Sequence, residues 1–117
     1  MNSYQEKIEK FLKDIRSKKI EVQEDKWYEF LKSELTFPFA AKIEDIDEFS
    51  KTDLEWNDIV NVKGIDNFID MYGILVEIRK GRRKYIFPLC DLEIIDKDSD
   101  NYFIIDQFLE WWADTYF

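Results

Sequence analysis

The sequence contains no histidine and a single cysteine, Cys90. Histidine is the commonest general base and a preferred zinc ligand, so its absence argues against acid–base catalysis and against a structural zinc site. Cys90 cannot form an internal disulfide, and its apolar neighbours predict a small buried side chain. No spacing of carboxylates singles out a catalytic acid and base. We therefore predict that the protein is not an enzyme.

Glycine and proline are also scarce, with three and two residues, which argues against a fold made mostly of loops. No apolar run approaches the ~20 residues of a membrane span. The first residues lack the basic and then apolar order of a secretory signal, so we expect a cytoplasmic protein. With 117 residues, 45% of them hydrophobic, the chain has enough material for one core. We predict a single domain over residues 1–117.

What the sequence has in excess is negative charge, with a net charge of −9 that is unevenly distributed. Residues 44–70 and residues 91–117 each carry a net charge of −7, and residues 71–90 between them carry +4. Such a surface attracts cations or basic proteins, and it repels nucleic acid and anionic membranes. Charge that serves only solubility would be scattered more evenly.

Three segments show the apolar periodicity of amphipathic helices. Residues 3–17 place Ile8, Phe11 and Leu12 on one face, and residues 25–34 follow with Asp25 as a candidate N-cap. A third helix is expected from about Ser99 to the C-terminus. The apolar face of residues 3–17 could dock on the core or on a partner, and docking on the core is the commoner outcome.

Five short segments between the second and third helices are typical of strands. They span residues 39–43, 59–64, 74–78, 85–87 and 92–95. The clearest is a hairpin around Gly81, between two runs rich in β-branched and aromatic residues. The predicted fold class is α+β, with a small, strongly bent antiparallel sheet or an SH3-like barrel flanked by N-terminal helices and a C-terminal helix.

An alternation of acidic residues precedes the third helix: Asp96-Lys97-Asp98-Ser99-Asp100-Asn101. This is the pattern of the first half of an EF-hand loop, in which alternate side chains direct oxygen atoms at one Ca²⁺ ion. The second half does not follow, because Asn101 stands where glycine is needed and Gln107 where a bidentate glutamate is needed. Alternatively, Asp98 and Asp100 only stabilise the positive end of the helix dipole.

Two other acidic clusters could supply oxygen ligands to calcium. Asp66 and Asp70 are four residues apart in an expected loop after Gly64, and Asp45, Asp47 and Glu48 follow the first strand. An ordinary solvated loop would have the same composition.

Several segments resemble a family of small acidic bacterial calcium-binding proteins, described as calcium buffers in heterocyst differentiation. The family's pattern W-Y-x-Y-L-x-x-x-L-x-F-P-F-x-A is similar to residues 27–41, which read WYEFLKSELTFPFAA. A strand ending in V-x-V-x-G and a V-P-L-x-x-L ending are similar to residues 60–64 and 87–92. The resemblance divides the chain into an N-terminal helical extension, residues 1–20, and a family-like region, residues 21–117.

The resemblance implies a non-catalytic calcium-binding protein, a buffer or sensor, that holds Ca²⁺ at acidic sites without EF-hands. The family tends to have acidic residues after the leucine that matches Leu31, where this chain has Glu34 nearby. A different class also fits the charge: an acidic interaction module, such as an immunity protein or a nucleic-acid mimic, that binds a basic protein. The candidate calcium ligands are Glu34, Asp66, Asp70, Asp96, Asp98 and Asp100.

Overall fold

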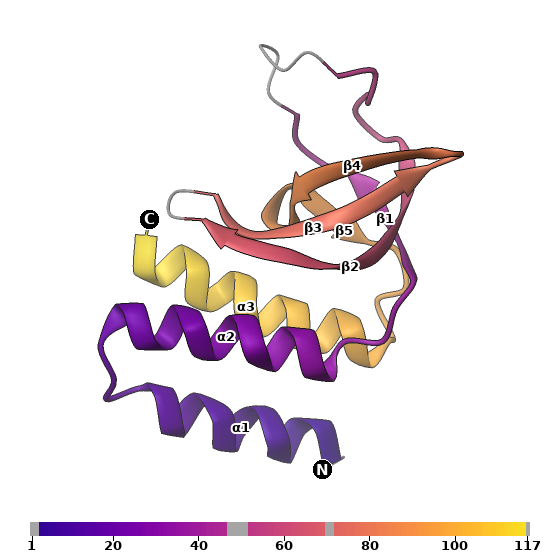
Figure 1. Ribbon diagram of the computed structural model, residues 1–117. Coiled ribbons are helices and arrows are strands. Elements are labelled where there is room, and N and C mark those ends of the chain that lie inside the picture. The colour runs from indigo at the N-terminus through magenta and orange to yellow at the C-terminus, as the bar shows by residue number, and fades with distance from the viewer. Residues whose placement is uncertain (1–2, 47–51, 70–71, 117) are drawn as a thin grey trace.

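The computed structural model describes residues 3–46, 52–69 and 72–116, except for the side chains of residues 3 and 4 (Figure 1). The described elements comprise three α-helices, five strands and one short 3₁₀ helix, as the sequence order predicted in outline. In chain order they are α1 (Ser3–Ile15), α2 (Ile20–Glu34), β1 (Phe39–Ile43), β2 (Ile59–Ile69), β3 (Gly73–Lys80), β4 (Arg83–Pro88), the 3₁₀ helix η1 (Leu89–Asp91), β5 (Leu92–Ile94) and α3 (Asp100–Tyr116).

The strands form one antiparallel sheet in the order β4-β3-β2-β1-β5. The pairing of β2 with β3 shifts register twice, between Val62 and Gly64 and between Ile65 and Asn67. Register shifts of this kind bend a strand and increase its twist. The predicted antiparallel sheet is confirmed. It is not closed into an SH3-like barrel, because β4 and β5 remain at opposite edges of the order.

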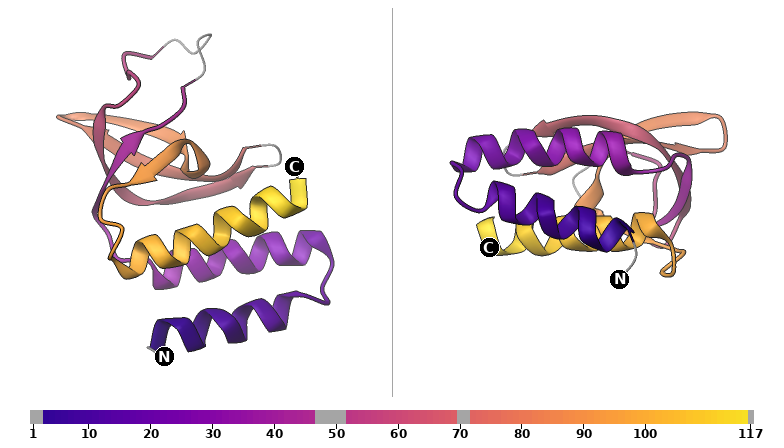
Figure 2. Two further views of the ribbon diagram at one scale, coloured as in Figure 1. Left: turned by 180° about the vertical axis from the view of Figure 1, so that it is seen from behind. Right: turned by 90° about the horizontal axis from the view of Figure 1, so that it is seen from below.

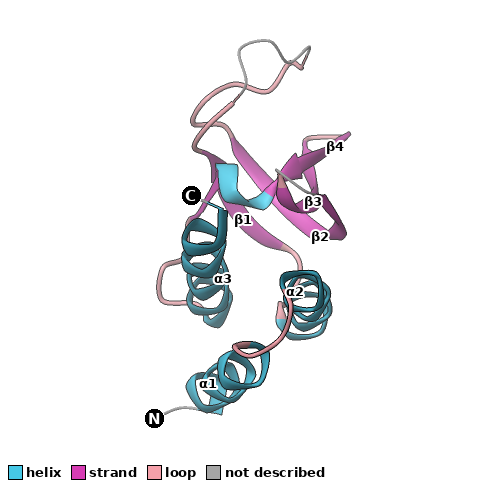
Figure 3. Ribbon diagram, turned by 90° about the vertical axis from the view of Figure 1, so that its left-hand side faces the viewer, coloured by secondary structure: helices cyan, strands magenta, loops and turns pink. Residues whose placement is uncertain are grey.

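The helices form two layers on one side of the sheet. Helices α2 and α3 lie side by side against it, and α1 lies beneath them, away from the strands (Figures 1 and 3). The view from below in Figure 2 confirms that α1 covers the two other helices on the outer side. In the described part of the chain, no helix is long and apolar enough to span a membrane.

An aromatic cluster joins the three helices. Trp27 on α2 is fully buried, and its ring centroid lies 4.7 Å from that of Phe11 on α1 and 5.4 Å from that of Phe108 on α3. Ile8 and Ile15 of α1 are also buried, so the predicted apolar face of this helix is confirmed. The core continues between the helices and the sheet through Val60, Val62, Val76, Ile78, Ile104 and Ile105.

Two boundaries differ from the prediction by five residues each. Helix α2 begins at Ile20, so Asp25 lies within the helix and is not its N-cap. The earlier start is accompanied by the burial of Gln23, whose amide donates to the Lys18 carbonyl oxygen at 2.8 Å and accepts from the Trp111 indole at 2.8 Å. Strand β2 continues past Gly64 to Ile69, because residues 64–69 pair with β3.

Asn101 ties the start of α3 to the segment between α2 and β1. Its side-chain oxygen accepts from the Thr36 backbone N–H at 2.9 Å, and its amide donates to the Thr36 carbonyl oxygen at 2.8 Å. The residue is only 8% exposed, so water cannot easily replace these bonds.

We expect Asn101→Ala to lower the free energy of unfolding by about 2 kcal/mol, since two backbone groups lose their partner. Urea denaturation followed by circular dichroism measures this loss, with Asp106→Ala on the exposed face of α3 as the control; equal stabilities of the two variants would contradict the assignment.

Candidate metal-binding site

The acidic alternation before α3 forms a capping turn. The Asp98 backbone N–H donates to the Asp96 side chain at 3.1 Å, and the Ser99 hydroxyl accepts from the Tyr102 N–H at 3.1 Å, capping α3 near its predicted start. Asp96, Asp98 and Asp100 are exposed and do not converge on one point. Asp100 lies in the first turn of α3, where a negative charge favours the helix dipole.

The mismatch of Asn101 with the EF-hand glycine position agrees with its place in the structure. Asn101 is within α3, and its side chain is engaged with Thr36. Among the described residues, Asn57 is the non-glycine residue with a positive φ, at 72°. The segment therefore lacks the left-handed turn of an EF-hand loop, and the assignment of its aspartates as ligands stays a prediction.

Asp66 lies in β2 and not in a loop, which corrects the expectation from sequence. Ile65 pairs with Val76 and Asn67 with Leu75, so Asp66 is at the second register shift of the strand. Its side chain is exposed. Asp70, its expected companion, lies outside the described residues, and so their pairing on an ion stays a prediction.

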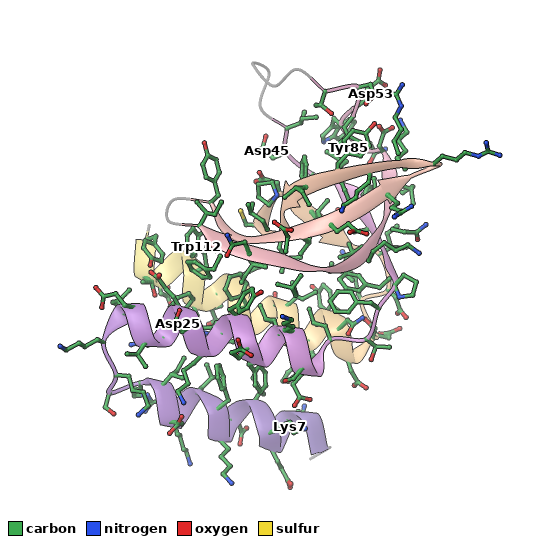
Figure 4. The ribbon with its side chains drawn as sticks, in the orientation of Figure 1. Lys7, Asp25, Asp45, Asp53, Tyr85 and Trp112 are labelled. Carbon is green, nitrogen blue, oxygen red and sulfur yellow. The ribbon has the colours of Figure 1, made fainter. Side chains whose placement is uncertain are left out.

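Glu34 already has a cationic partner. At the end of α2 its carboxylate accepts from Lys7 Nζ on α1, at 2.9 Å through Oε1 and 3.1 Å through Oε2. Figure 4 labels Lys7 on α1, beneath α2. A metal ion bound at Glu34 would therefore have to displace the lysine.

Asp45, from one of the predicted acidic clusters, lies beside Asp91, which the sequence did not single out, where β1 ends next to η1. The backbone N–H groups of Glu44 and Asp45 donate to the carbonyl oxygen of Asp91, at 2.9 and 3.3 Å. Asp45, which Figure 4 labels, is exposed, and Asp91 is half-buried. Burial is the main cause of a raised pKa of Asp91, and the negative charges of Asp45 and then Glu44 raise it further. We call Asp45 and Asp91 the Asp45–Asp91 pair.

The thiol beside this pair is not a suitable ligand. Burial, followed by the charge of Asp91, raises the pKa of Cys90 to about 11, and its Sγ lies 3.8 Å from Asp91 Oδ1. At neutral pH Cys90 is therefore a protonated, half-buried side chain, close to the predicted role. What the site offers is carboxylate and carbonyl oxygen, which a hard cation prefers.

The Asp45–Asp91 pair differs from Asp53 and Asp58 in lacking a cationic partner. Asp58 bonds Lys80 at 2.8 Å and Asp53 bonds Arg83 at 2.9 Å, and Tyr85 donates to Asp53 (Figure 4). The hydrogen bond from Lys80 is the main cause of a lowered pKa of Asp58. The hydrogen bond from Tyr85 is the main cause of a lowered pKa of Asp53. Within residues 3–46, 52–69 and 72–116, no such ion pair forms at Asp45 or Asp91.

The described residues do not complete a site by themselves. They contain no group of three or more acidic, cysteine or histidine side chains placed to hold one metal ion. Asp47 and Glu48, the companions of Asp45 in the predicted cluster, lie outside the described residues. A sequence signal for Asp91 does exist: an acid between Leu89 and Leu92, both buried, is unusual without a partner or a function.

Comparison with known proteins also points to calcium binding. Residues 9–112 match a protein family of the CcbP type, described as calcium binding. The crystal structure of Anabaena CcbP is similar, with 29% sequence identity, a TM-score of 0.67, and coverage of 85% of this chain and 80% of that one. A calcium binding protein in its calcium-binding form shares the fold at 23% identity, with a TM-score of 0.66 over 100% of this chain and 99% of that one. None of the curated proteins matches the sequence.

Proposed function

Since this chain belongs to the CcbP-type calcium-binding family, we propose that it binds Ca²⁺ reversibly, as a buffer or sensor, and catalyses no reaction. The observation that carries the proposal is the Asp45–Asp91 pair, in which a half-buried carboxylate faces negative charge. Calcium takes six to eight oxygen ligands, and carboxylates of this kind are its preferred protein ligands.

The electrostatics of the pair favour a bound cation. In the calcium-free protein, ionised Asp91 is destabilised by burial and by its acidic neighbours, as its raised pKa indicates. A divalent cation would reverse the sign of that interaction, because each carboxylate would then face positive charge. The backbone bonds from Glu44 and Asp45 to Asp91 already fix the two segments beside each other, so less chain has to be ordered on binding.

The ligands expected from sequence remain proposals of a second rank. Binding at Glu34 competes with Lys7, and binding by Asp96, Asp98 and Asp100 requires these side chains to turn toward one another. Asp66 would need Asp70 or another acid beside it. We therefore expect these positions to bind calcium more weakly than the Asp45–Asp91 pair.

A calcium titration followed by ¹H–¹⁵N NMR tests the proposal. We expect saturable shifts below about 1 mM Ca²⁺, the weak limit of known calcium modules, first at Asp45, Asp91 and the neighbouring Leu92. Shifts at Asp96–Asp100 should come later in the titration. The control is a matched titration with Na⁺ at equal ionic strength. Shifts that never saturate, or that Na⁺ reproduces, would show that the protein only attracts counterions.

A further inference from the structure

A groove runs between α1 and α3 on the side of the molecule away from α2. Its walls and floor include Leu12 and Ile15 of α1 and Trp111 of α3, with Gln23 of α2 at the base. Figure 3, viewed along the helices, shows α1 and α3 one above the other on that side. The Trp111 indole N–H donates to Gln23 at 2.8 Å, so the aromatic part of the groove is held in one orientation.

A row of acids borders this groove on α3. Asp106, Glu110 and Asp114 are spaced four residues apart, so they lie on one face of the helix, and all three are exposed. Glu110 and Asp114 line the groove directly. In the described part of the chain, none of the three acids forms a salt bridge.

This row is unfavourable for the helix that carries it. Like charges four residues apart repel one another, and acids near a helix C-terminus oppose its dipole. The last turn of α3 has no basic residue to compensate. A cationic partner would remove both penalties.

We propose that the α1–α3 groove binds an amphipathic basic helix of another protein, with its apolar side chains against Leu12 and Trp111. Lysines or arginines four residues apart on that helix would match the axial spacing of the acids on α3, which is about 6 Å for four residues. Arg16 lines the α1 side of the groove, and its positive charge would repel a basic helix. The surface that is complementary to such a helix is therefore confined to α3. This interaction is separate from calcium binding at the Asp45–Asp91 pair, and it uses different residues.

The test uses an 18-residue model helix of leucine and lysine, with lysines at i and i+4, and the full-length protein in the presence of a chelator. Fluorescence anisotropy of the labelled peptide gives the affinity, and the Trp111 indole signal in NMR locates the site. We expect the double variant Glu110→Lys and Asp114→Lys to weaken binding at least about tenfold, and Arg16→Ala to strengthen it. Glu110→Gln with Asp114→Asn should give an intermediate loss.

The matched control is Asp25→Lys with Glu29→Lys, which changes the net charge equally on the exposed face of α2 (Figure 4 labels Asp25). We expect this variant to bind the peptide with nearly the wild-type affinity. Equal losses in both double variants would overturn the proposal in favour of general charge attraction. A Trp111 signal that does not move when the peptide is added would also overturn the proposal. A Trp111 signal that shifts with protein concentration in the absence of peptide would overturn it as well, because it would indicate a second copy of this chain as the occupant.

Discussion

Replacing Trp27 by alanine is expected to lower the free energy of unfolding by about 3–5 kcal/mol, the usual loss for a large buried aromatic side chain. The indole is fully buried, and its neighbours Phe11 and Phe108 belong to different helices. Its removal therefore leaves a cavity where α1, α2 and α3 meet. Urea denaturation gives the loss, and an unchanged m-value shows that the transition stays two-state.

Trp27→Phe separates the packing of this ring from its polarity. Within the described residues, the Trp27 indole nitrogen is buried and has no hydrogen-bond partner. Phenylalanine therefore removes no hydrogen bond and leaves a smaller cavity, and we expect a loss well below that of alanine. If phenylalanine were as destabilising as alanine, the role of Trp27 would depend on its N–H group and not on its volume.

The helices and the hairpin could be predicted because their signals are local. Ile8 and Ile15 share a face by helical spacing alone, and Gly81, with φ at 62°, supplies the turn conformation that the hairpin between β3 and β4 requires. The start of α2 could not be predicted in this way. Gln23 is buried through a bond to Trp111, a residue 88 positions away in the sequence.

The extension of β2 was missed for a similar reason. Residues 65–69 include Asp66 and Asn67 and have the composition of a loop, but pairing of Ile65 with Val76 and Phe68 with Ile74 makes them a strand. Strand propensity depends on the partner strand more than on the residue itself. Such a pairing cannot be inferred from the polar composition of the segment.

The acids of residues 44–58 show why the site was only partly predictable. Composition predicted the excess of carboxylates, but it could not distinguish Asp53 and Asp58, which bond to the basic hairpin, from Asp45, which lies beside Asp91. That distinction depends on which residues the fold places opposite each acid. Asp91 is more than 40 positions from Asp45 in the sequence, so the sequence alone gave no reason to pair them.

Asp91→Asn is expected to weaken calcium binding at least about tenfold. This loss is comparable to or larger than the effect of removing groups that support a metal ligand. Asp45→Asn should act in the same direction. In the absence of calcium, removing the charge of Asp91 is expected to be favourable, because it acts on the stability of the fold and not on a bound ion. Because the pKa of Asp91 is raised in the folded protein, its ionised form lowers stability at pH values above that pKa, and the penalty disappears as the pH falls through it. Calcium-free Asp91→Asn should therefore be at least as stable as the wild type at pH 7.

The two effects together separate ligand loss from damage to the fold. Calorimetric titration gives the affinity, and thermal unfolding with and without Ca²⁺ gives the stabilisation, which depends on the ratio of calcium concentration to Kd. Asp25→Asn, at an exposed acid on α2, removes the same charge and should leave both measurements near wild-type values.

Calcium affinity of the wild type should also fall as the pH is lowered through the raised pKa of Asp91, because protons then compete for its carboxylate. An Asp91→Asn protein that keeps its calcium affinity and this pH dependence would place the ion elsewhere in the molecule.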